Sequence, residues 1–210
     1  MALVFWEDPV LQPEAENVLD FWFADLGSKG QVTADCSRLW FGKDEAVDRE
    51  LADRFGHTVE AVGTGDLDAW AATALGRLAL VLVCDQLPRN IYRDMPRAFA
   101  FDSRALRLAK AGIERGEDLS LGIAQRAFFY LPFEHAEDMA MQDLSVKLFA
   151  KLKEDGGDIH EKATASFLDY AEQHRVIIAR FGRFPHRNRI LGRDSTPEEV
   201  DFLRQPGSSF

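Results

Sequence analysis

The chain has 210 residues, of which 46% are hydrophobic and 29% are charged, as is ordinary for one globular domain with a sizeable core. Its 35 acidic residues outnumber its 25 Lys and Arg residues, so the formal net charge is -10. This excess of negative charge argues against nucleic acid or an anionic membrane as a general partner.

Other features indicate a soluble protein of the cytoplasm. The first residues, MALVFWEDPV, lack the basic region of a signal peptide and include acids. The longest apolar stretch, residues 69–84, contains Arg77 and is shorter than the ~20 residues of a membrane-spanning helix. Cys36 and Cys84 fit a reduced compartment better than a disulfide-bonded scaffold. We therefore expect a cytoplasmic location without a membrane segment.

Helix signals recur along the chain, whereas strand signals are nearly absent. The first predicted helix has Pro13 near its first turn and Gly27 beyond its last turn. Residues 43–63 are charged and amphipathic. Residues 65–86 follow a candidate N-cap, Asp66, and are apolar almost all round, which predicts a buried central helix.

The rest of the chain predicts further helices from its prolines, glycines and caps. These are residues 95–116, 120–131, 132–157, 159–182 and 195–205. Pro132 is placed in the first turn of the third of them, and Thr196 before Pro197 marks the start of the last. The stretch from Gly27 to Gly42 is expected to be a long connection. About eight helices with short loops predict antiparallel helix pairs in a single all-α domain over residues 1–210.

A first polar motif, DQLPRNIYR, covers residues 85–93. Pro88 is expected to end the central helix, which places Asp85 in its last turn, where the helix dipole disfavours a carboxylate. Asp85 therefore needs cations or donors, and Arg77, Arg89 and Arg93 are the local candidates. We expect buried Arg77 to take a carboxylate partner, with Asp85 as the nearest. An ion pair that fixes the turn explains the motif equally well.

A second motif, YLPFEHAED, covers residues 130–138. Glu134 and Asp138 are four residues apart, on one face of a predicted helix, with His135 beside them. Two carboxylates and an imidazole could perform acid-base chemistry or hold a metal. Alternatively, the dipole of a helix stabilises acids in its first turns, which explains Glu134 without any function. The spacing matches no zinc signature, so no metal site is predicted.

The third motif, RVIIARFGRFPHRNRILGR, covers residues 175–193 and holds six arginines without lysine or acid. Arginine without lysine favours fork-shaped recognition of carboxylate or phosphate, although these side chains could instead neutralise the protein's own acids. His174, just before the motif, lies in an apolar stripe of the predicted helix. A histidine in such a stripe is more commonly a hydrogen-bonded core residue than a catalyst.

Together, DQLPRNIYR, LPFEHAED and FGRFPHRN, in this order and spacing, resemble the bacterial family of unknown function numbered 924. The resemblance extends from about residue 20 to about residue 193. Family members often have Phe where this chain has Leu87 and Ser where it has Ala136, so a hydroxyl at 136 is not available for chemistry. The resemblance implies an all-α, tetratricopeptide-like superhelix of helix pairs, and it brings no catalytic assignment.

We expect the three motifs to form one polar pocket that binds a small anionic ligand, with hydrolysis as the least committal reaction class. The candidate catalytic residues are His135, His174, Glu134 and Asp138. The candidate ligand-binding residues are Asp85, Arg89, Arg93, Arg180, Arg183, His186 and Arg187. Two alternatives stay open: a tetratricopeptide-like module that binds peptides, and a buried polar network whose role is purely structural. The sequence specifies neither a cofactor nor an oligomeric state.

Overall fold

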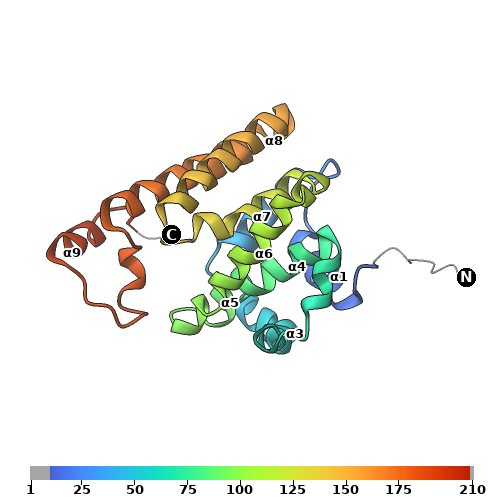
Figure 1. The fold of residues 1–210 in the computed structure, drawn as a ribbon, viewed down its shortest axis with the longest axis horizontal. Coiled ribbons are helices and arrows are strands. Elements are labelled where there is room, and N and C mark those ends of the chain that lie inside the picture. Colours follow the sequence, from blue (N-terminus) through green and yellow to red (C-terminus); the bar gives the residue numbers. More distant parts are fainter. Residues whose placement is uncertain (1–9, 209–210) are drawn as a thin grey trace, which may run out of the picture.

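A computed structural model of the chain describes residues 10–208, which Figure 1 shows as packed helices. The α-helices are α1 (Pro13–Phe23), α2 (Ala34–Phe41), α3 (Glu45–Thr64), α4 (Ala74–Asp85), α5 (Leu87–Ile91), α6 (Asp102–Glu114), α7 (Ile123–Glu134), α8 (Met139–Phe181) and α9 (Pro197–Leu203). Short 3-10 helices lie between them: η1 (Asp68–Ala72), η2 (Pro96–Phe99), η3 (Glu117–Ser120) and η4 (Pro185–Arg187). Residues 10–208 contain no strand, so the prediction of an all-α fold is confirmed. The tetratricopeptide-like superhelix stays a prediction.

Two features bear on the predicted location of the protein. Among residues 10–208, no helix combines the length and the apolar character that crossing a membrane requires. Residues 1–9, which carry the argument against a signal peptide, lie outside the described part of the chain.

Helix α4 is the central buried helix that its apolar sequence predicts. Every residue from Gly76 to Asp85 is buried, and α4 contacts α1, α6 and α7. The predicted start at Asp66 is wrong, because η1 intervenes and Thr73 caps α4 by accepting a hydrogen bond from the Gly76 N–H. Only glycine fits at this turn, since a Cβ atom on Gly76 would lie 2.1 Å from the backbone oxygen of Trp70.

Arg77 lies inside this helix with 5% of its surface exposed. Its Nε donates to Glu117 Oε2 at 2.5 Å, and its Nη2 donates to the backbone oxygen of Ala71 at 2.8 Å. The predicted carboxylate partner is therefore present, but the choice of Asp85 is wrong. Arg77 and Asp85 are about two turns, or roughly 12 Å, apart along α4. The segment that follows α6 places Glu117 closer to Arg77 than any acid of α4 itself.

Helix α2 lies within the stretch that the sequence analysis assigns to a long connection. Thr33 caps it, and Trp40 near its end is buried. The Trp40 ring packs edge-on against Phe128 of α7, with ring centroids 4.7 Å apart. An isolated helix of this length is unstable in water, so its stability comes from this tertiary packing, which no local pattern in the sequence reports.

The boundary between α7 and α8 differs from the prediction in a way that matters for the site. Pro132 does not begin a helix; it lies inside α7, which continues to Glu134. Helix α8 begins after Asp138, whose carboxylate accepts a hydrogen bond from the Met141 N–H. The residues of α7 around Pro132 are buried, so packing holds the helix together past the missing N–H. Glu134 therefore ends a helix rather than beginning one.

Helix α8 consists of two helices joined at Gly157, where φ is 57°. Figure 1 shows the two parts running side by side, from yellow to orange. This break agrees with the predicted stop at residues 156–157. The first part leaves the end of α7, and the second part returns toward it, which brings His174 within 3.3 Å of Glu134.

The C-terminal helix α9 begins as predicted. Thr196 caps it, Pro197 follows, and Glu199 completes the cap by accepting from the Thr196 N–H at 2.7 Å. Both oxygens of Glu199 also accept hydrogen bonds from Arg183, at 2.6 and 2.8 Å. Arg183 thus fastens α9 to the end of α8.

Acid is expected to loosen α9 through this pair. The Arg183 hydrogen bonds are the largest of the contacts that lower the pKa of Glu199 from 4.5 to about 2. A lowered pKa means that the stabilisation is fully present above pH 4.5 and is lost as the pH falls toward about 2. The protection factors of the α9 amides, which are exchange rates corrected for the intrinsic effect of pH, should fall across this range. In the Glu199→Gln variant protection should already be low at neutral pH and should not fall further with acid; equal protection profiles in both proteins would contradict the prediction.

Candidate functional site

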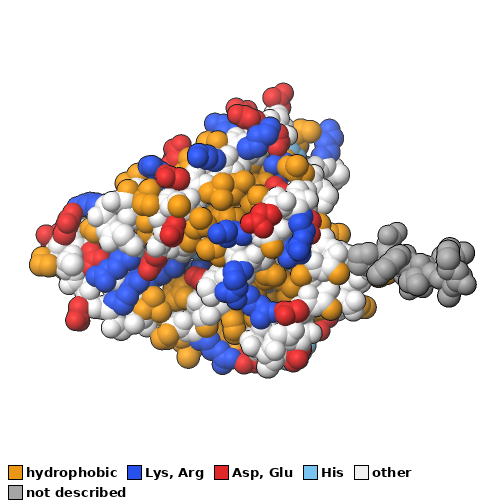
Figure 2. Space-filling model, viewed as in Figure 1, with side chains coloured by type: hydrophobic (Ala, Val, Ile, Leu, Met, Phe, Trp, Pro, Cys, Tyr) orange, Lys and Arg blue, Asp and Glu red, His pale blue; other side chains and the backbone are white. Residues whose placement is uncertain are grey.

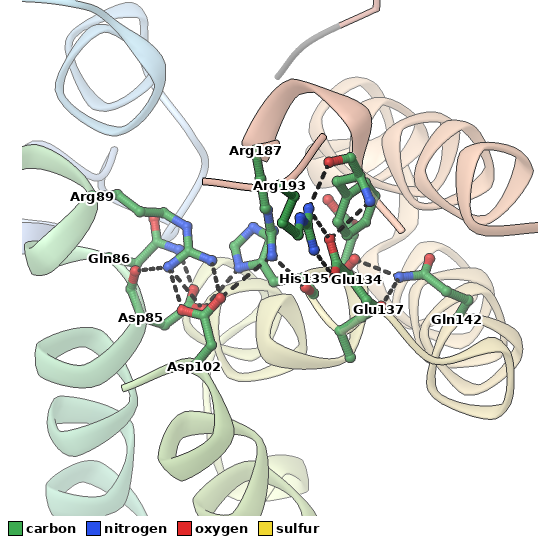
Figure 3. Close-up of polar contacts among 12 residues, drawn as sticks. Asp85, Gln86, Arg89, Asp102, Glu134, His135, Glu137, Gln142, Arg187 and Arg193 are labelled. Carbon is green, nitrogen blue, oxygen red and sulfur yellow. Dashed lines mark hydrogen bonds and ion pairs between the residues drawn. The ribbon is translucent and has the colours of Figure 1, made fainter. Parts of the chain in front are cut away.

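The three polar motifs meet where α4, α7 and the segment after α8 come together (Figure 3). Helix α6 and the start of α8 contribute as well. We call this set the polar cluster, and it consists of Asp85, Gln86, Arg89, Asp102, Glu134, His135, Glu137, Gln142, His174, Arg187 and Arg193. The sequence analysis did not single out Gln86, Asp102, Glu137, Gln142 or Arg193.

Asp85, the last residue of α4, is fully buried. Its Oδ1 lies 2.8 Å from His135 Nδ1, and its Oδ2 accepts from Gln86 Nε2 at 2.5 Å. The Arg89 guanidinium lies 3.4 Å away. Burial by itself raises the pKa of Asp85, but Arg89 and His135 together outweigh burial and hold the pKa below its ordinary value. Asp85 is therefore a buried carboxylate that stays charged.

His135 caps the end of α7, and Figure 3 shows its ring between the side chains of α4–α5 and those of the C-terminal segment. Because charged Asp85 can only accept a hydrogen bond, His135 Nδ1 carries the proton. Burial, aided by Arg89, lowers the pKa of His135 even though Asp85 opposes the shift. The imidazole is therefore neutral at pH 7, with its lone pair on Nε2. Its side chain is 13% exposed.

Glu134, the last residue of α7, is 4% exposed. Burial, followed by the charge of Asp85, raises the pKa of Glu134 to about 8. Its Oε1 lies 3.3 Å from His174 Nδ1, while its Oε2 has no hydrogen-bond partner among the described residues. Gln142 closes the end of α7 by donating its Nε2 to the backbone oxygens of Glu134 and Ala136. The helix dipole, offered above as a reason for Glu134, opposes a charge at this end.

His174 lies in the buried stripe of α8, as predicted, with 4% of its surface exposed. Its Nδ1 donates to the backbone oxygen of Tyr170 at 2.8 Å. Burial, followed by His135, lowers the pKa of His174 to about 3. His174 is therefore a neutral imidazole whose Nε2 carries the lone pair.

Arg187 is buried between two aromatic rings. Its guanidinium carbon lies 4.5 Å from the ring centroid of Phe184 and 4.9 Å from that of Phe99. Its Nη1 donates to the backbone oxygen of His135 at 3.1 Å, but its Nε has no hydrogen-bond partner among residues 10–208. Burial, with Arg89 as the next cause, lowers the pKa of Arg187 to about 10, so it stays charged at neutral pH.

Asp102, the first residue of α6, lies between the two arginines of the cluster. Both of its oxygens accept from Arg89, at 3.0 and 3.1 Å, and its Oδ2 lies 3.6 Å from Arg187. One carboxylate therefore serves two guanidinium groups. In the sequence, Asp102 stands out only as an acid in the first turn of a helix. Such acids are too common to indicate a functional site.

A second ion pair ties the C-terminal segment to the end of α7. Arg193 donates to both oxygens of Glu137, at 2.6 and 3.0 Å. Glu137 Oε1 also accepts from the Phe184 N–H at 2.8 Å. This pair holds the loop that carries Arg187 against His135.

Several residues that the sequence analysis assigned to the same pocket lie elsewhere. Asp138 caps α8, Arg93 donates to Asp48 of α3, and Arg180 and Arg183 pair with Glu198 and Glu199. Each of these residues pairs with an acid or caps a helix outside the cluster. His186 stays at its edge, with its ring 5.7 Å from that of Phe184, and burial, aided by Arg187, lowers the pKa of His186 to about 4. Figure 2 shows the resulting mixture of basic and acidic side chains over the C-terminal segment, at the left.

Comparison with known proteins gives the family. Residues 18–207 match the family described as "Bacterial protein of unknown function (DUF924)". The chain belongs to this family. It is also similar to the solved structure of ATU0120, a protein of unknown function from Agrobacterium tumefaciens, with 40% sequence identity and a TM-score of 0.74 over 90% of this chain and 96% of that one. No curated protein matches the chain.

The polar cluster of this DUF924 protein combines groups that differ in charge and in hydrogen-bonding capacity. Asp85 and Asp102 balance Arg89 and Arg187, while the imidazoles of His135 and His174 are neutral. Neutral imidazoles can bind metal ions or accept protons, and guanidinium groups can bind oxyanions. A purely structural network would pair all of its buried polar atoms, whereas a binding site leaves some for a ligand. The unpaired atoms of the cluster include a donor on Arg187 and an acceptor on Glu134.

Proposed function

We propose that this protein binds a small anionic molecule, a carboxylate or a phosphate, at the polar cluster, and that the reaction class its groups fit is hydrolysis. The observation that carries the proposal is the buried Nε of Arg187, which has no hydrogen-bond partner among residues 10–208. An unsatisfied donor on a charged group costs about 1–3 kcal/mol or more. An oxygen of a bound anion would satisfy it.

The unequal pairing of the two arginines supports an anion rather than a neutral ligand, although Asp85 and Asp102 balance their total charge. Arg89 and Arg187 share the single carboxylate of Asp102, and Arg89 holds it with two hydrogen bonds. Arg187 is thus the less satisfied of the two arginines. Its guanidinium plane is fixed by stacking on Phe99 and Phe184 and needs little reordering to bind a planar or tetrahedral oxyanion.

A purely structural network is the second candidate. It is favoured by the internal pairing of Arg89 and Arg193 with acids of the protein. Buried networks that serve structure alone are generally fully satisfied. The unpartnered Nε of Arg187 is the feature that such a network does not explain.

The test measures thermal stabilisation by anions in metal-free protein. We expect millimolar phosphate or small carboxylates, at constant ionic strength, to raise the Tm of the wild type by several degrees. Arg187→Lys keeps the charge but loses the planar fork, so the response should fall at least about tenfold in apparent affinity. Arg180→Lys is the matched control, because Arg180 is exposed and pairs with Glu198 instead, and it should respond as the wild type does.

Two results would overturn the binding proposal: a wild-type Tm that no anion shifts, or an Arg187→Lys response equal to that of the wild type. Hydrolysis is tested separately with a panel of nitrophenyl esters and phosphates. Turnover that Arg187→Lys lowers and Arg180→Lys leaves unchanged supports it, and a panel without turnover overturns this part alone.

A further inference from the structure

Three side chains of the polar cluster have the composition of a metal site. Glu134, His135 and His174 each offer one ligand atom, and these three atoms lie within 4.8 Å of one another. Two imidazoles and one carboxylate form the ligand set of open catalytic zinc sites, in which a water molecule takes the fourth position. We propose that these three residues bind a divalent transition-metal ion and that Zn²⁺ suits them best. The inference goes beyond the proposed function and depends on different atoms.

Both histidines are oriented as metal-binding histidines usually are. His135 Nδ1 donates to the Asp85 carboxylate at 2.8 Å, and His174 Nδ1 donates to the backbone oxygen of Tyr170 at 2.8 Å. Each contact places the proton on Nδ1 and the lone pair on Nε2. Histidine ligands typically donate their other nitrogen to a carboxylate or a backbone carbonyl, which fixes the ring and strengthens the ligand.

Glu134 supplies the independent observation. Glu134 is 4% exposed, and its Oε2 has no hydrogen-bond partner among the described residues. It also ends α7, where the helix dipole disfavours negative charge. The guanidinium groups nearby are bonded to Asp102 and Glu137, and no ion pair joins them to Glu134. A bound cation would supply the missing partner for this acceptor.

The spacing requires a small contraction. A tetrahedral zinc ion with ligand bonds of about 2.0–2.2 Å keeps its ligand atoms roughly 3.3–3.6 Å apart. Glu134 Oε1 lies 3.3 Å from Nδ1, the non-ligating nitrogen of His174, so the segments that carry these two residues are already close together. The three ligand atoms lie within 4.8 Å of one another, and bringing them to the spacing of a zinc site requires side-chain shifts on the order of 1 Å. Changes of rotamer can supply such shifts.

The experiment measures zinc itself on the full chain. Protein stripped with a chelator is dialysed against Zn²⁺, desalted and assayed for metal, and the affinity is measured by competition with a chromogenic chelator. We expect a single zinc ion per chain. Glu134→Gln keeps the size and removes the charged ligand, so zinc affinity should fall by roughly 100-fold or more. Asp85→Asn removes the charged hydrogen-bond partner of His135, so affinity should fall by about 10–100-fold.

A surface pair provides the matched control. His57 Nε2 lies 3.0 Å from Glu14 Oε1, and the His57 side chain is 71% exposed. His57→Gln should leave zinc affinity unchanged within about twofold, since exposed pairs are weak. Circular dichroism of the stripped variants checks that each is folded, and stoichiometry on the wild type does not depend on any variant.

Stripped wild-type protein that binds no zinc at micromolar concentration would overturn the inference. Equal affinities in the wild type and a folded Glu134→Gln variant would overturn it as well. Because the anion test uses metal-free protein and Arg187, either proposal can fail while the other stands.

Discussion

Replacing Asp85 with alanine is expected to lower the free energy of unfolding by about 3–5 kcal/mol, because it breaks a buried ion pair by removing one partner. The carboxylate is fully buried and accepts from His135 and Gln86. Without this carboxylate, Arg89 still pairs with Asp102, but the positive charges of Arg89 and Arg187 are no longer balanced. The donors on His135 and Gln86 also lose their acceptor. Urea unfolding followed by circular dichroism measures the change.

Two further variants make the Asp85 result specific. Asp85→Asn keeps the shape and one acceptor, so its cost should lie between those of the wild type and Asp85→Ala. Asp35→Ala removes an exposed carboxylate from an ion pair with Arg38, and such pairs contribute about 0–1 kcal/mol. If Asp85→Ala costs no more than Asp35→Ala, the polar cluster is not held together by Asp85.

Replacing Arg77 with alanine should have the second largest effect, a loss of about 3–4 kcal/mol. The substitution removes both the guanidinium that pairs with Glu117 and the apolar stem that fills space in α4. Arg77→Met keeps the stem, and Glu117 is 20% exposed, so this variant should cost less. The two variants therefore separate packing from charge.

The control for Arg77 uses the same carboxylate. Arg115 lies 3.9 Å from Glu117, with 59% of its side chain exposed, so Arg115→Ala should cost less than about 0.5 kcal/mol. Both changes are measured by urea unfolding. An Arg77→Ala variant as stable as Arg115→Ala would show that α4 does not need the buried pair.

Much of the candidate site could be located from single residues in unusual surroundings. Asp85 was assigned to a helix end that opposes its charge, and the structure gives it Arg89, as expected, together with His135. His174 was assigned to an apolar stripe, and it is buried there. These predictions work because helix position and apolar periodicity are local properties that a sequence states directly.

One wrong helix boundary has a tertiary cause. Pro132 predicts the start of a helix, because proline commonly occupies that position. Burial of its neighbours kept α7 intact to Glu134, and this moved Glu134 from a favourable helix start to an unfavourable helix end. Glu134, His135 and His174 were each candidate residues, but the sequence did not group them as the metal site proposed above. Glu134 and His135 are adjacent and His174 is far along the chain, so no spacing signature joins the three.

By itself, then, the sequence determined the all-α class, most helix ends, the buried course of α4 and the break near Gly157. Tertiary structure alone decided that Arg77 pairs with Glu117, that Asp102 joins the cluster, and that Arg180 and Arg183 serve α9 instead. Caps, glycine stops and apolar periods act within a few residues of the chain. The partner of a buried charge depends on distances between helices, which exist only once the helices have packed.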